Sequence, residues 1–209
     1  MKKKEEKALA ALEQFLPPDT FDMVAPHFYA HRIHLTLTHE RKSVLGDYRI
    51  PTRSLPVHRI SINSTLNRYS FLITLLHEMA HLLTWVHFAD KAAPHGREWK
   101  TQFRHLLVPF MGRRIFPADV EEALHAYLQN PAASTCTDAR LYKALYRYDT
   151  RRPGYRLVDD IRVNGQFATE DGRVWEKVES LRTRARCRCL ETGKMYFFQG
   201  IVEVKAVRS

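Results

Sequence analysis

Two histidines and a glutamate are spaced in this sequence so that together they could bind a metal and move a proton. His77, Glu78 and His81 form the pattern H-E-x-x-H. Four residues advance a helix by about 400°, so both imidazoles project from nearly the same face and can reach one Zn²⁺. Glu78 lies beside them, close enough to take a proton from a water on the metal but poorly directed to bind the metal itself. The pattern therefore predicts zinc-assisted hydrolysis with Glu78 as general base.

The segment that must carry this pattern is the most apolar part of the chain. Residues 67–88 have a helical pattern that is apolar on nearly every side, which is typical of a helix in the interior of a domain. Histidine and glutamate are costly to bury there unless they are hydrogen-bonded or bound to a metal. Two core histidines satisfied by hydrogen bonds are the alternative, which must still explain why a glutamate accompanies them.

A catalytic zinc site has three protein ligands and one position for water, so a third ligand is needed. The best candidate is His95, which stands next to Gly96 just before the next expected helix, where a tight turn could bring its imidazole back over the first helix. His87 is near in sequence, but six residues beyond His81 it points away from the shared face. The other candidates that the sequence leaves open are His105, Asp90 and Glu98.

Both segments together carry a family resemblance. Residues 71–81, followed by the run His-Gly-Arg-Glu-Trp-Lys at 95–100, resemble the SprT-like (Spartan-type) metallopeptidases. That family has HExxH on a buried helix and then a His-Gly-x-x-(Phe/Trp) signature that supplies the third ligand. The resemblance covers roughly residues 10–150.

The resemblance implies a fold, a site and a substrate class. It implies a compact α+β minigluzincin-like domain with one Zn²⁺ held by His77, His81 and His95, which hydrolyses peptide bonds of protein substrates. In the characterised branch of the family it also implies cleavage of proteins crosslinked to DNA, assisted by DNA-binding elements.

Around the zinc-binding helix, the pattern predicts a mixture of helices and strands. Strands are expected at 33–38 and 58–63, separated by a loop that contains Gly46 and Pro51. The other expected helices are 5–16, 20–31, 98–110, 118–128 and 138–148.

The character of the chain changes near residue 150, from helical to strand-forming. Short alternating segments are expected as strands at 161–167, 173–178, 183–190, 194–198 and 201–207, with hairpin turns at 170–172 and 191–193. We therefore expect two domains. These are an SprT-like zinc metallopeptidase domain at 1–150 and a small, basic, antiparallel β-rich domain at 151–209.

The cysteines set an expectation for this second domain. Many SprT-like proteins end in a four-ligand zinc ribbon, whereas the tail here offers only Cys187 and Cys189. Two thiols on one strand cannot close a tetrahedral site by themselves, so we expect a β-rich tail without zinc, a degenerate form of the ribbon. With Cys136 the count is odd and has no framework spacing, which favours reduced thiols.

Positive charge is concentrated toward the C-terminus. The formal net charge is +10; from Arg140 onward there are 16 Lys and Arg against 9 Asp and Glu, or +7, which leaves +3 for residues 1–139. Four arginines alternate along one expected strand and share one face: Arg182, Arg184, Arg186 and Arg188. This face could position phosphates of DNA, with the aromatic residues 196–198 stacking on bases. The alternative is a solvated sheet face with the aromatic residues in the core.

Composition places the chain among ordinary water-soluble proteins, with 44% hydrophobic and 27% charged residues. No uninterrupted apolar run approaches the roughly 20 residues of a membrane span, and the first residues lack the apolar core of a secretory signal. We therefore expect a cytoplasmic protein without a membrane segment.

Two functions from different classes fit these observations. The first is a zinc metallopeptidase in which His77, His81 and His95 hold the metal and Glu78 is the base, acting on DNA-associated or DNA-crosslinked proteins. The second is a nucleic-acid-binding or scaffold protein whose metal site is structural or weakly active. The carboxylate of Glu78 favours the first function, because a purely structural site has no use for it.

Overall fold

The chain folds into two compact units, each described here by itself. The computed structural model describes residues 9, 11–39, 44–129, 131, 138–150 and 153–208. The units are Met1–Asp149 and Thr150–Ser209, so the division lies beside residue 150, where the sequence changes from helical to strand-forming patterns. Cys136 and part of the first expected helix lie outside the described residues.

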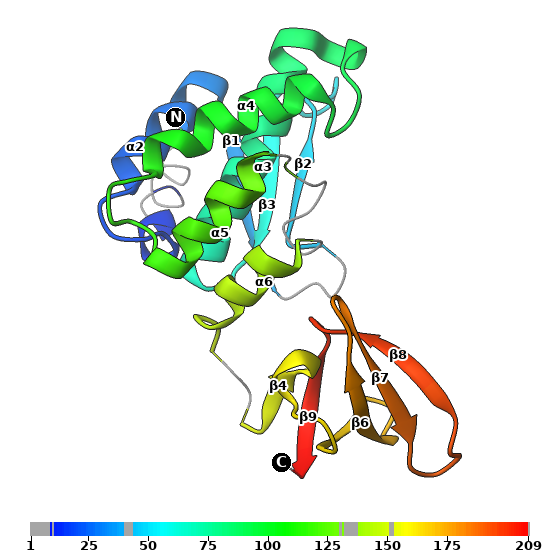
Figure 1. Ribbon diagram of the computed structural model, residues 1–209. Coiled ribbons are helices and arrows are strands. Elements are labelled where there is room, and N and C mark those ends of the chain that lie inside the picture. The colour runs from blue at the N-terminus through cyan, green and yellow to red at the C-terminus, as the bar shows by residue number, and fades with distance from the viewer. Residues whose placement is uncertain are drawn as a thin grey trace. The chain divides into compact units, whose positions relative to one another are not determined.

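The N-terminal unit contains a three-stranded mixed sheet (Figure 1). Its strands are β1 (Ile33–Thr38), β2 (Gly46–Arg49) and β3 (His58–Asn63), in the order β1-β3-β2. β1 runs parallel to β3, and β2 pairs with β3 in the antiparallel direction. The expectation of a loop around Gly46 is therefore wrong. The strand is only four residues long and has the sequence Gly-Asp-Tyr-Arg, which shows no apolar alternation, so pairing with β3 rather than local pattern makes it a strand.

The helices of this unit lie close to where their periodicity predicts them. They are α2 (Phe21–His31), α3 (Arg68–Phe88), α4 (Arg97–Leu107), α5 (Ala118–Gln129) and α6 (Ala139–Tyr146). Short 3-10 helices are η1 (Glu13–Phe15), η2 (Ala89–Lys91) and η3 (Val108–Phe110). The helix expected at 98–110 thus tightens after Leu107, where Pro109 follows and removes a backbone donor.

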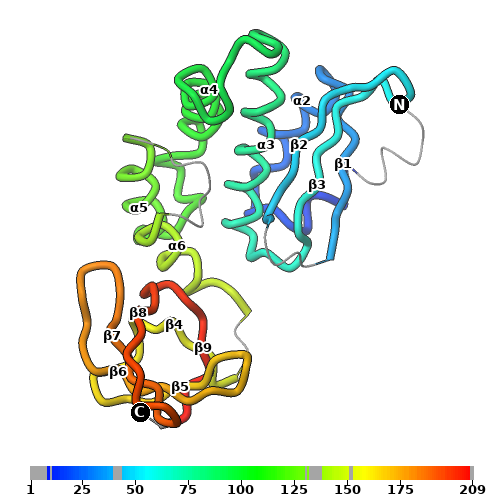
Figure 2. Tube along the Cα trace, turned by 90° about the vertical axis from the view of Figure 1, so that its right-hand side faces the viewer, coloured from blue at the N-terminus to red at the C-terminus, as the bar shows by residue number. Residues whose placement is uncertain are grey.

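Helix α3 forms the centre of the N-terminal unit. Figure 2 shows it running between the three-stranded sheet and helices α4 and α5. All residues from Ser70 to Ala80 are buried, as the apolar pattern predicts for an interior helix. By length and composition the segment Arg68–Lys91 could cross a membrane, but 67% of its most apolar stretch is buried inside the unit, as in the core helix of a folded domain.

The C-terminal unit is a six-stranded antiparallel sheet with its own core. Its elements are β4 (Tyr155–Leu157), η5 (Val158–Asp160), β5 (Gln166–Ala168), β6 (Val174–Ser180), β7 (Arg184–Cys189), β8 (Met195–Gln199) and β9 (Glu203–Arg208). The strand order is β4-β9-β5-β6-β7-β8, and the strands curl into a ring around the core (Figure 2). Gly172 and Gly193 occupy the two expected hairpin turns with left-handed φ angles of 84° and 69°.

Candidate metal centre

Helix α3 places two of the predicted ligands one turn apart in the interior. Its first turn is capped by Asn67, whose side-chain oxygen accepts hydrogen bonds from the backbone N–H groups of Tyr69 and Ser70. The amide of Asn67 also donates to the carbonyl oxygen of Leu145, which ties the start of α3 to the end of α6. The start of α3 is thus fixed before the helix reaches His77.

A tight turn before α4 brings the third histidine back to α3. The backbone N–H of Gly96 donates to the carbonyl oxygen of Ala93 at 2.9 Å, and His95 lies between them with a left-handed φ of 54°. A Cβ at position 96 would lie 2.9 Å from that carbonyl oxygen, so the turn requires glycine there. A left-handed conformation costs a residue other than glycine about 1–3 kcal/mol and persists only where its surroundings enforce it. The turn predicted from His95 and Gly96 is present.

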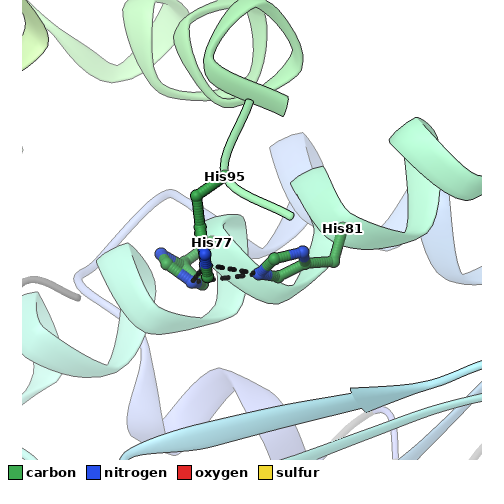
Figure 3. Close-up of side chains that lie close together, drawn as sticks. All are labelled: His77, His81 and His95. Carbon is green, nitrogen blue, oxygen red and sulfur yellow. Dashed lines mark hydrogen bonds between the residues drawn. The ribbon is translucent and has the colours of Figure 1, made fainter. Parts of the chain in front are cut away.

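The three imidazoles converge on one point (Figure 3). His77, His81 and His95, hereafter the triad, have Nε2–Nε2 separations of 3.2, 3.0 and 3.3 Å. Tetrahedral zinc with Zn–N distances of about 2.0–2.1 Å requires ligand nitrogens about 3.3–3.4 Å apart. The triad therefore fits three corners of a tetrahedral site and leaves the fourth for another ligand.

Hydrogen bonds alone cannot satisfy such a triangle. Along each side one nitrogen must donate and the other must accept, and this alternation fails around a ring of three. A cation accepts all three lone pairs at once. Among the described residues, the triad is the group of side chains that could hold a metal ion.

Comparison with known proteins agrees with this geometry. The model of the SprT-like family matches residues 21–114, a range that contains the triad and Glu78. Residues 21–114 are an SprT-like domain. The chain is similar to Protein SprT of Shigella boydii serotype 18, of Klebsiella pneumoniae strain 342 and of Escherichia coli K12. Each of them is 40% identical over 60 residues, which are 27% of this chain and 36% of the relative.

The extent of these matches is limited. The chain spans well under half of the length of the curated relatives it matches, and the family match ends at residue 114, before the C-terminal unit begins. No solved structure matches the chain.

The environment of the triad in the SprT-like domain keeps the imidazoles neutral. Burial, together with the nearby His81 and His95, lowers the pKa of His77 to about 3. Burial and then the proximity of His95 lower the pKa of His81 to about 4, and burial also lowers the pKa of His95. Neutral imidazoles have a lone pair for a cation, which protonated ones lack.

Trp99 forms the wall against which all three imidazoles pack. Its ring centroid lies 4.7 Å from that of His77, 5.4 Å from that of His81 and 4.8 Å from that of His95. Trp99 also stacks on Phe103, with ring centroids 5.2 Å apart. In the sequence Trp99 is visible only as part of the family signature. The signal for its packing role is its position four residues after His95, on the first turn of α4.

The predicted base, Glu78, is buried between α3 and the edge strand β2 of the SprT-like domain. Glu78 is 6% exposed, and its side chain lies against the backbone of Gly46. Gly46 was expected only as a loop residue, and the sequence gives no sign of this contact. The contact arises from the packing of β2 against α3, two elements that are separate in the sequence.

The structure separates the triad from the other candidate ligands. The cluster of converging nitrogens includes none of the four alternatives, His87, Asp90, Glu98 and His105. His87 is exposed in the last turn of α3 and lies outside the cluster, as its spacing predicts.

In the C-terminal unit, the two cysteines belong to the core. The residues of β7 alternate strictly between exposed and buried, with Ala185, Cys187 and Cys189 buried. Burial raises the pKa of Cys187 to about 11, so its thiol is neutral and a poor metal ligand at neutral pH.

Arg184, Arg186 and Arg188 lie on the exposed face of β7, as the alternation predicts. Arg182 is exposed but precedes the strand, because the chain bends at residues 182–183 in the hairpin between β6 and β7, so the prediction that all four arginines share one strand is wrong for Arg182. Two of the four arginines are neutralised. Arg186 forms an ion pair with Glu179 at 3.3 Å, and Arg188 forms one with Glu176 at 2.6 Å. Arg182 and Arg184 make no ion pair with any described residue.

The aromatic residues of β8 divide between the core and the surface. Phe198 is buried, whereas Tyr196 is 57% and Phe197 is 49% exposed. In the register of β7 and β8, Phe197 pairs with Arg186 on the exposed face. The alternative of aromatic residues in the core therefore holds for Phe198 alone.

Proposed function

We propose that the SprT-like domain is a zinc-dependent peptidase. The observation that carries the proposal is the convergence of three neutral imidazole nitrogens at tetrahedral spacing, on the same helix turn as a buried carboxylate. Membership of residues 21–114 in the SprT-like family supports it. The finer fold assignment, a minigluzincin-like arrangement of this domain, belongs to the same proposal.

The residues have separate tasks in this proposal. The triad holds Zn²⁺ through its three Nε2 atoms and leaves one position open. When bound, the metal supplies a Lewis acid that polarises a peptide carbonyl and lowers the pKa of water. Glu78 takes a proton from the attacking water and returns it to the amine of the leaving peptide, so that the carboxylate is regenerated.

Turnover of an unfolded protein substrate, measured beside metal content, tests the assignment. We expect wild type with one zinc per chain to cleave the substrate, and Glu78→Gln to keep its zinc and its fold while cleavage falls about 10²–10⁴-fold. Equal cleavage by both proteins at equal zinc content would show that Glu78 is not the general base. Absence of zinc from folded, zinc-supplemented wild type would contradict the proposal that the domain is a zinc peptidase.

For the substrate we propose proteins associated with or crosslinked to DNA, with DNA bound by the C-terminal unit. This unit carries much of the positive charge, with Arg182 exposed just before β7, Arg184 exposed at the start of β7, and the exposed Phe197 on the neighbouring strand β8. Arginines without a carboxylate partner can replace condensed counterions on phosphates, and an exposed ring can stack on a base. Reduced, unpaired Cys187 and Cys189 agree with a cytoplasmic location, which we propose with it.

The salt dependence of DNA affinity tests the proposed contacts between these arginines and DNA phosphates. We expect affinity for a fluorescent oligonucleotide to fall steeply with salt, and Arg182→Ala/Arg184→Ala to reduce the slope of log affinity against log salt by about 1–2. The matched control is Arg186→Ala/Arg188→Ala, which removes guanidinium groups that already have carboxylate partners and should change the slope less. Binding that is absent, or independent of salt, would exclude DNA as a partner.

The second candidate function is a nucleic-acid-binding or scaffold protein with a structural metal site. The fully buried wall of Trp99 behind the triad favours it, because rigid packing around a metal also suits a structural site. Zinc binding that stabilises the fold, without cleavage of any protein substrate by wild type, would support this candidate over the peptidase.

A further inference from the structure

The closest approach between β2 and α3 is made by Gly46 and Glu78. A Cβ built on Gly46 would lie 2.7 Å from Oε1 and 2.8 Å from Cγ of Glu78. The same Cβ would lie 2.7 Å from the Cγ2 methyl group of Thr74. Contacts this short are not tolerated, so any side chain at position 46 must displace the side chain of Glu78, of Thr74, or of both.

The backbone of Gly46 does not itself require glycine. Its φ angle lies outside the left-handed region, unlike those of Gly112, Gly154, Gly172 and Gly193. Residue 46 is part of a regular antiparallel pair with Ile62 of β3, a conformation that other residues adopt readily. The missing side chain at this position therefore provides space rather than conformational freedom.

The start of β2 is held in place from the side of β3. The buried side-chain amide of Asn63 donates to the carbonyl oxygen of Val44 at 3.1 Å. The backbone N–H of Asn63 donates to the carbonyl oxygen of Leu45 at 2.9 Å. The two residues before Gly46 are thus anchored to β3, so the strand cannot easily retreat from a larger side chain. The flexible end of Glu78 is the part that would move.

We propose that Gly46 is a positioning residue for Glu78: the bare backbone of β2 forms the surface against which the Glu78 carboxylate rests. This inference rests on the proposed function, in which Glu78 moves the proton. Gly46 touches neither the triad nor a substrate in this role. It acts by leaving free the space that the buried carboxylate occupies.

The substitution that tests this role adds a single methyl group. In Gly46→Ala we expect kcat to fall about 10–100-fold, because a displacement near 1 Å of a catalytic group costs up to about that factor. KM and the zinc content should stay at wild-type values, since the triad is not touched. The matched control is Gly165→Ala in the C-terminal unit. A Cβ on Gly165 would meet a carbonyl oxygen and a methyl group, both at 2.9 Å, so the crowding is comparable. Gly165 belongs to the other unit and is far from Glu78 in the sequence, so kcat should not change.

A second substitution separates Glu78 from Thr74 as the group through which Gly46 acts. Thr74→Ser removes the Cγ2 methyl group and with it one of the close contacts. Gly46→Ala/Thr74→Ser should therefore keep the low kcat of Gly46→Ala. Full recovery of kcat in the double variant would overturn the proposal, because the loss would then come from crowding of Thr74.

Thermal unfolding of the zinc-free protein tests the contact without any activity. Gly46→Ala should lower the melting temperature of wild type by about 2–4 °C, but should lower that of Glu78→Ala by clearly less, because the shortened side chain leaves room for the new methyl group. Equal losses in both backgrounds would overturn the contact. If wild type cleaves no substrate, the proposed function fails, but the melting temperatures still test whether Gly46 contacts Glu78. If wild type is active and Gly46→Ala cleaves equally well, the proposed function stands and only the positioning role of Gly46 fails.

Discussion

Both units of the chain enclose polar side chains, but these side chains differ in how their bonding capacity is used. In the N-terminal unit the triad directs three Nε2 atoms at one another, an arrangement in which donor–acceptor pairs cannot form along all three sides. In the C-terminal unit Lys177 is more deeply buried than the triad, at 2% exposed against 8% for His77 and partial burial of His81 and His95. Its ammonium group donates to the carbonyl oxygens of Val158, Asp159 and Ile161 at 3.1, 3.3 and 2.7 Å.

The difference shows which buried polar groups indicate a site. Lys177 has three protons and three carbonyl partners, so it secures the turn of η5 and has no proton left for a ligand. The three Nε2 atoms of the triad face one another, and simple donor–acceptor pairing fails along at least one side of this triangle. Burial of a polar group therefore does not by itself indicate function. The decisive feature is whether the protein supplies every bonding partner, and this can be tested by substitutions in both units.

The largest effect is expected from removing one member of the triad. His95→Ala should weaken zinc binding at least about 100-fold, more than the loss of a partner outside the ligand set costs. The fold should remain, because His95 is only partly buried and lies in a turn. Zinc competition with a chromophoric chelator gives the affinity, and circular dichroism reports the fold. His105→Ala, an exposed histidine of α4, is the control and should bind zinc as wild type does. Equal affinity in the two variants would mean that His95 is no ligand.

The next largest effect is expected at Lys177, where a substitution should lower stability and leave zinc binding unchanged, the opposite of His95→Ala. Lys177→Met keeps the alkyl chain but leaves carbonyl oxygens of the η5 turn without their donor. It should lower the free energy of unfolding of the C-terminal unit by about 1–3 kcal/mol while zinc affinity stays unchanged. Urea denaturation followed by circular dichroism measures the loss. Lys205→Met, the same change at an exposed position of β9, should have little effect on either quantity. An unchanged free energy of unfolding in Lys177→Met would show that the three hydrogen bonds of Lys177 do not stabilise the C-terminal unit.

A smaller effect is expected from the wall behind the triad. Trp99→Phe leaves an aromatic ring but reduces the surface on which the imidazoles pack, so zinc affinity should fall about 10-fold. The indole nitrogen of Trp99 is buried and makes no hydrogen bond with any described residue, so the substitution removes no hydrogen bond. Trp85→Phe, at a partly buried position of α3 outside the ring contacts of the triad, is the control in the same domain. A loss of fold without loss of affinity would make Trp99 a core residue alone.

Local patterns predicted most of the elements in this molecule because the periodicities are strong. The helix of 67–88 and the strands of 33–38 and 58–63 lie within one residue of α3, β1 and β3. The alternation of 183–190 also predicts which side of β7 is exposed. Strand β2 was missed, since its four residues have no pattern of their own and its pairing with β3 is a tertiary interaction.

The candidate site was predicted to a similar degree, and for related reasons. Spacing on one helix is local, so the pairing of His77 with His81 follows from the sequence, and the resemblance to SprT-like proteins added His95. The contacts of Trp99 with the triad and of Gly46 with Glu78 join elements that are separate in the sequence. No residue spacing encodes such contacts, so they could be found only in the folded chain.

The smallest effect is expected where polar groups pair on the surface instead of in the interior. Arg188 and Glu176 lie 2.6 Å apart on neighbouring strands, but the arginine side chain is 53% exposed and water competes for both charges. Arg188→Ala should therefore change the free energy of unfolding by less than about 1 kcal/mol. Urea denaturation beside Lys177→Met measures both on one scale. If Arg188→Ala lowered the free energy of unfolding as much as Lys177→Met, an exposed ion pair would contribute as much as a cation bonded to three carbonyl oxygens in the interior. Burial would then not explain the contribution of Lys177 to stability.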